Sequence, residues 1–118
     1  MIQLKRAYEQ TASTDGYRVL VDRLWPRGET KEKLALDLWL KDIGPSNELR
    51  KWFNHVPEKF PEFTEKYIQE LQSGAENAAL VRLQTIVKQQ PVVTLVYGAK
   101  DTEHNNAVVL KEVLKSMG

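Results

Sequence analysis

The run from Pro91 to Tyr97, Pro-Val-Val-Thr-Leu-Val-Tyr, constrains the fold more than any other stretch of this chain. Its residues are mostly β-branched, and apolar side chains fall on both of its faces. Strands that are buried on both faces occur in parallel sheets, whose strands are connected through covering helices. The run from Tyr17 to Leu24 has the same property, because its valines and leucines occupy opposite faces. The two runs therefore predict interior strands of a parallel sheet.

Hydrophobic patterning predicts the other elements. A first strand is expected over 2–8, followed by a turn over 13–16. The segment from Lys31 to Ile43 is ambiguous, because its alternating leucines favour a strand while its composition favours a helix. We expect a helical turn over 31–34 and then a strand to Asp42. Apolar residues at helical spacing predict four helices, from Ser46 to Pro57, from Glu58 through Leu71, from Ser73 through Val87, and from Glu103 to Ser116.

The order of these elements, β-β-(α)-β-α-α-α-β-α, indicates the fold class. Long helical crossovers between apolar strands predict a small, mostly parallel sheet with helices on both faces, a three-layer α/β domain. A chain of 118 residues suits a single domain over 1–118 with one core. Ser46 or Asn47 is expected to cap the helix that begins there, and Ser73 with Glu76 fits a capping box.

Composition excludes several classes of function. The 17 basic and 16 acidic residues give a net charge of +1, so no global field attracts nucleic acid or an acidic membrane. The absence of cysteine excludes disulfides, thiolate metal sites and cysteine nucleophiles. The common nucleotide-binding, serine-hydrolase and zinc-protease motifs are missing, so no cofactor or metal is expected. No run has the length of a signal peptide or membrane span, which predicts a cytoplasmic protein.

Polar and basic side chains follow the predicted strands and begin the predicted helices. The carboxyl ends of strands in an α/β sheet are where ligand-binding groups collect. Arginine forks bind phosphate or carboxylate in bidentate fashion, and helix starts near Ser46 and Asp101 add oriented amides. These residues predict a pocket for a small anionic ligand, formed by Arg23, Arg27, Lys41, Ser46, Arg50, Lys100 and Asn105, with Trp25 and Trp39 as its walls.

A purely structural interpretation competes with this pocket. Arg23, Arg27 and Lys41 have possible ion-pair partners in Asp22, Asp37, Asp42 and Asp101. Tryptophans are common in cores, and Ser46 and Asp101 are suited to be helix caps. In that case the protein is an interaction module or homo-oligomer that uses an exposed patch formed by Trp39, Trp52 or Phe53.

Three residues are candidates for acid–base chemistry. His55 and Asp101 are the first choices, and His104 is a further titratable group. The structural alternatives are that His55 interacts with the carbonyls at its helix end and that His104 faces solvent in a first helical turn. Asp101, His104 and His55 have no recognised metal-ligand spacing.

The motif from Val21 to Gly28, Val-Asp-Arg-Leu-Trp-Pro-Arg-Gly, resembles the signature of the YeaO-like proteins of domain of unknown function 488. The resemblance extends through Asp37-x-Trp-x-Lys-Asp, Pro45-Ser-x-x-Leu-Arg-x-Trp-Phe-x-His and Thr94-Leu-Val-Tyr-Gly-Ala-Lys-Asp. It implies a bacterial α/β domain without an established activity.

More distant relatives of that family carry cysteine and glutamate where this chain has Tyr97 and Ala99. They also carry Cys-His-Arg at the positions of Asn105, Asn106 and Ala107. Any chemistry that depends on those cysteines is closed to this chain.

Overall fold

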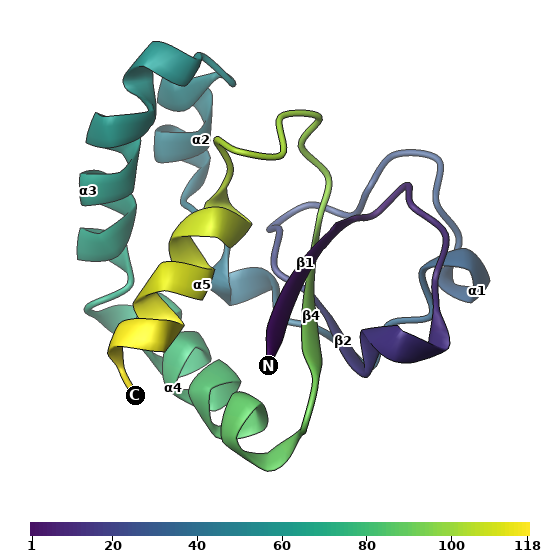
Figure 1. Cartoon of the computed structure of the whole chain (residues 1–118). Coiled ribbons are helices and arrows are strands. Elements are labelled where there is room, and N and C mark those ends of the chain that lie inside the picture. Colours follow the sequence, from purple (N-terminus) through teal and green to yellow (C-terminus); the bar gives the residue numbers. More distant parts are fainter.

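Four parallel strands form the sheet of the computed structural model, which describes all 118 residues (Figure 1). Their order across the sheet is β1-β4-β2-β3. The strands are β1 (Ile2–Arg6), β2 (Tyr17–Leu20), β3 (Leu38–Trp39) and β4 (Val93–Tyr97). All three pairings are parallel, which confirms the predicted α/β class.

The two interior strands are the two that the sequence predicted. Every residue of β4 is buried, and Leu95 pairs with Leu4 of β1 on one side and Val19 of β2 on the other. The strand β2 ends at Leu20, earlier than the predicted Leu24. It ends because the Asp22 carboxylate, in place of a backbone carbonyl, accepts the hydrogen bond from the Gly98 N–H.

Helices cover the two faces of the sheet unequally. In Figure 1, α2 (Asn47–Phe53), α3 (Phe60–Glu70), α4 (Gly74–Gln89) and α5 (Asn106–Ser116) gather on one side, and the short α1 (Lys31–Leu34) lies on the other. A core of 19 buried residues fills the side of the four helices. The side of α1 holds a cluster of four buried residues, Ala7, Leu20, Leu34 and Val96.

Two predicted helix caps have different outcomes. Ser46 caps α2 as predicted, since its Oγ accepts a hydrogen bond from the Leu49 N–H at 3.1 Å. The predicted capping box at the start of α4 is wrong, because the Ser73 side chain makes no capping bond. The Glu76 carboxylate points instead toward Arg23, and its Oε2 lies 4.0 Å from Nη2 of that guanidinium.

A buried ion pair anchors the start of β2. Arg18 is 4% exposed and Asp15 is 3% exposed, and Arg18 Nη1 lies 2.7 Å from Asp15 Oδ2. Lys5 adds a second contact, with Nζ 2.9 Å from Asp15 Oδ1. Burial acts to raise the pKa of Asp15, but hydrogen bonds from the Ala12 N–H, Lys5 and Arg18 outweigh it and lower the pKa below 3.8.

We predict that Asp15→Asn lowers the free energy of unfolding at pH 7 by about 3–5 kcal/mol, because Arg18 is left buried without its counter-charge. The folded-state pKa of Asp15 is depressed, so its stabilisation is present above pH 3.8 and is lost as the pH falls through the folded value. Urea denaturation at pH 7 and near pH 3 measures both effects. A difference between variant and wild type that stays constant with pH contradicts this account. Glu62→Gln, at an exposed pair with Lys66, is the control and costs about 1 kcal/mol at most.

Candidate functional site

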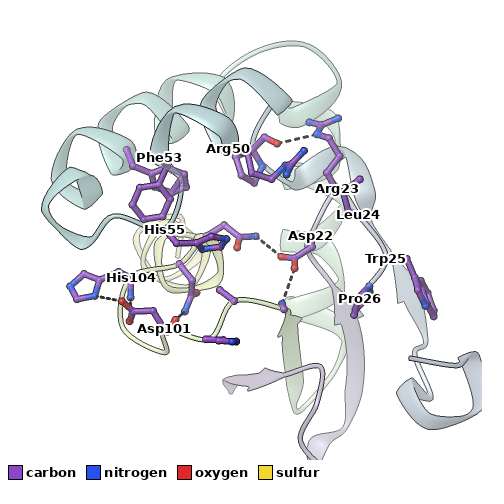
Figure 2. A pocket seen from close by; sticks show the side chains of 17 residues that line it. Asp22, Arg23, Leu24, Trp25, Pro26, Arg50, Phe53, His55, Asp101 and His104 are labelled. Atoms are coloured by element: carbon purple, nitrogen blue, oxygen red, sulfur yellow. Dashed lines mark hydrogen bonds and ion pairs between the residues drawn. The ribbon is translucent and has the colours of Figure 1, made fainter. Parts of the chain in front are cut away.

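A cavity of about 650 Å³ opens at the carboxyl ends of β2 and β4. Its walls come from the segment after β2 (22–26), the second half of α2 with the turn that follows, and the segment between β4 and α5 (98–106) (Figure 2). Ligands of open α/β sheets bind at this edge, because the strands end there and the loops supply polar groups.

The structure brings together most of the residues predicted from the sequence. The predicted residues that line the cavity are Arg23, Trp25, Arg50, Lys100 and Asn105, with the candidate acid–base residues His55 and Asp101. Four predicted residues lie outside the lining, and these are Arg27, Trp39, Lys41 and Ser46.

The four outlying residues have other contacts. The indole of Trp39 packs edge-on against Trp25 at 5.3 Å between ring centroids, and Lys41 Nζ lies 4.5 Å above the Trp39 ring. Arg27 is exposed, while Ser46 is occupied by its capping bond and by hydrogen bonds to Glu70. Trp39 is therefore a structural neighbour of the cavity wall rather than part of it.

Arg23 uses its guanidinium to hold the chain before α2. Its Nε donates to the Pro45 carbonyl at 3.0 Å, and its Nη2 donates to the Gly44 carbonyl at 2.8 Å. It forms no ion pair with the aspartates that the sequence suggested. The backbone is close here, since a Cβ on Gly44 would lie 2.6 Å from the Arg23 amide nitrogen. Arg23 therefore has a structural role on the rim of the cavity.

Among the residues that line the cavity, Arg50 is the guanidinium with a buried nitrogen that has no hydrogen-bond partner. Its Nη2 makes one hydrogen bond of 3.2 Å to Asn47 Oδ1, and no carboxylate lies within ion-pair distance. Its Nε is buried and has no hydrogen-bond partner. Figure 2 shows this side chain extending from α2 over the cavity.

Asp22 is the acidic group of the cavity that sequence reasoning treated only as an ion-pair partner. Its Oδ2 accepts from the Gly98 N–H at 2.8 Å, and its Oδ1 accepts from Asn106 Nδ2 at 3.1 Å. Burial raises the pKa of Asp22, and the opposing hydrogen bonds and the positive charges of His55 and Arg50 do not cancel this effect. One feature of the sequence could have indicated that Asp22 belongs to the site, namely its position as the first polar residue after a buried strand.

Asp101 orients His104 at the opposite side of the cavity. The Asp101 Oδ2 lies 2.9 Å from His104 Nδ1, and Oδ1 accepts from the backbone N–H groups of Glu103 and His104. Those backbone bonds and the histidine lower the pKa of Asp101. The expectation that Asp101 caps the last helix is wrong, because Asn105 accepts from the Val108 N–H and is the cap of α5.

Neither histidine has the purely structural placement that the sequence allowed, with His104 facing solvent and His55 bound to the carbonyls at its helix end. His104 precedes α5, is half-buried and meets the Phe60 ring edge-on at 5.2 Å. His55 follows Asn54, and both residues have left-handed backbone, with φ of 57° and 48°. This turn places His55 on the cavity, where it makes no hydrogen bond to the carbonyls of α2 (Figure 2). No group of three or more potential ligands is arranged to hold a metal ion.

Aromatic rings form the apolar wall of the cavity. Phe53 and Phe63 stack at 4.3 Å between centroids, and sequence reasoning missed the contribution of Phe63 because it belongs to α3. Phe53 is buried, and Trp52 is half-buried beneath Lys59 and Lys66. These positions do not form the exposed aromatic patch that an interaction module would use.

Comparisons with known proteins identify relatives along nearly the whole chain. The profile of the family described as the inactive DUF488-N3 subclade matches residues 1–117. The chain is 48% identical over 116 residues to the uncharacterized protein YeaO of Escherichia coli (strain K12), covering 98% of both chains. It is 40% identical over 113 residues to the uncharacterized protein Rv3073c of Mycobacterium tuberculosis (strain H37Rv), covering 96% of this chain and 92% of that protein. No solved structure matches the chain.

The helices of the structure include none with the length and apolar composition of a membrane span.

We predict that Asn106→Ala lowers the free energy of unfolding by about 1–3 kcal/mol, because it removes donors from Asp22 and from the buried Val21 carbonyl. Loss of one donor also raises the pKa of Asp22 further. The stabilisation linked to Asp22 is complete at acid pH and is lost as the pH rises through its folded pKa, so this loss shifts to higher pH. A carboxyl NMR titration and urea denaturation measure the two effects. An unchanged titration would contradict the assignment, and the exposed Gln72→Ala is the control, with a change within about 0.5 kcal/mol.

Proposed function

The chain belongs to the inactive DUF488-N3 subclade, and we propose that it binds a small phosphate- or carboxylate-bearing molecule in the cavity at the carboxyl end of the sheet. The word inactive in the family's description favours binding over turnover. Arg50 is the principal anion-binding group of this proposal, and Lys100 contributes a second positive charge at the exposed rim.

The observation that carries the proposal is the state of Arg50. A buried guanidinium nitrogen without a hydrogen-bond partner is costly, because its desolvation is not compensated. The Nη1 of Arg50 also makes no hydrogen bond within the protein and is not buried, so an oxyanion in the cavity can accept hydrogen bonds from this guanidinium, and such charge-assisted bonds are typical of phosphate and carboxylate sites. Arg23 has fewer donors to offer, since backbone carbonyls already accept from its Nε and Nη2.

The size and walls of the cavity indicate a molecule larger than a bare ion. Small-molecule sites typically enclose about 300–1,000 Å³, and about 650 Å³ lies within this range. Phe53, Phe63 and Trp25 provide apolar surface for the body of the ligand, while the charged groups fix its orientation. The proposed ligand is therefore an organic anion.

Thermal-shift and calorimetric titrations with inorganic phosphate, ethyl phosphate and 3-phenylpropionate test the proposal. A ligand of the native state raises the melting temperature with increasing concentration. Loss of the guanidinium in Arg50→Ala weakens anion binding roughly tenfold or more, because the lost hydrogen bonds are charge-assisted.

The matched control is Lys51→Ala, which removes one positive charge from the exposed face of the same helix. It keeps wild-type affinity if the cavity is responsible for binding. Equal weakening by the two variants would show non-specific charge attraction and contradict the proposed site. An Arg50→Ala protein that no longer folds would show that Arg50 is structural and would also contradict it.

A further inference from the structure

We infer that the organic anion also carries a protonated amine, which Asp22 receives in the cavity while Arg50 binds the anionic group. This inference rests on the proposed anion site and adds the chemical class of its ligand, an amino acid or aminoalkyl phosphate. The same cavity contains an acidic and a basic side chain, Asp22 and Arg50.

Asp22 has hydrogen-bonding capacity that the protein does not use. A carboxylate accepts about four hydrogen bonds, and the protein supplies two, from the Gly98 N–H and from Asn106. No lysine, arginine or histidine nitrogen lies within 4.0 Å of its oxygens. Both donors that hold Asp22 are neutral, and the nearby Arg50 and His55 act on it only from beyond ion-pair distance.

The other acidic residue of the cavity lining and the buried acidic residue of the fold both have basic partners. Asp101, which also lines the cavity, is paired with His104 and accepts two backbone N–H groups. The buried Asp15 is paired with Arg18 and Lys5. Asp22 is thus the one acidic residue of the cavity lining whose negative charge is free for a ligand cation.

Arg50 and Asp22 lie on different walls of the cavity, on α2 and at the end of β2 (Figure 2). They form no ion pair with each other, and both line the same cavity. A molecule with one anionic and one ammonium group complements both poles, whereas a simple anion leaves Asp22 uncompensated and adds repulsion.

Matched probes that differ only in the amine test this inference on the wild-type protein. One pair is O-phosphoethanolamine and ethyl phosphate, and the other is L-phenylalanine and 3-phenylpropionate. We expect the amine-bearing member of at least one pair to bind roughly tenfold tighter, because a charge-assisted bond to Asp22 is gained. The two pairs also distinguish phosphate from carboxylate as the anionic group.

Variants locate the origin of the preference. Asp22→Asn removes the charge with little change of shape and is expected to abolish the preference for the amine. Asp101→Asn, at the other acidic residue of the cavity, is expected to retain it. Arg50→Ala is expected to weaken both members of the binding pair together.

Three results would overturn the inference. Equal affinity within both pairs would show that Asp22 only holds the fold, and the anion site itself would stand. A preference that survives in Asp22→Asn would place the amine elsewhere. No binding of any of the four probes would overturn the anion site, and the inference with it. If Asp22→Asn does not fold, the wild-type probe pairs alone decide.

Discussion

Asp22 joins the end of β2 to two parts of the chain that are distant in sequence, Trp39 of β3 and the segment from the end of β4 to the start of α5. It binds the Gly98 N–H at the end of β4 and the Asn106 side chain at the start of α5, and the Asp22 backbone carbonyl accepts from the Trp39 indole. A partly buried charge that is held by neutral donors costs free energy, and this burial raises the pKa of Asp22. The edge of the sheet is therefore built around a group that is not optimal for stability.

The interior of the fold could be predicted because its signals are local. The strands β2 and β4 carry apolar residues on both faces, and the helices repeat theirs at helical spacing. Strand ends are different, because they depend on distant partners. The strand β2 stops before Asp22 owing to a contact with Gly98, 76 residues away, and no local pattern records that contact. The absent capping box has the same origin, since Glu76 turns toward Arg23.

The candidate site was only partly predictable for a related reason. Chain order indicated that Arg50 and Lys100 would reach the carboxyl edge of the sheet, and both line the cavity. Chain order could not show on which face of the sheet the Trp39 side chain would lie. Trp39 pairs in register with Leu20, whose side chain belongs to the cluster beneath α1, so Trp39 packs there and not in the cavity.

The separation of Arg50 from Asp22 follows from how α2 is held. Arg23 ties the Gly44 and Pro45 carbonyls to the end of β2, Tyr67 donates to the Ile43 carbonyl, and Glu70 binds Ser46 at the cap of α2. These bonds position the helix that carries Arg50, and Arg50 forms no ion pair with Asp22. Two unlike charges that are not paired with each other can each be compensated by a ligand group of the opposite charge. This arrangement supports the proposed ligand that carries both signs, because the hydrogen bonds around the cavity already hold the segments that bear both charges.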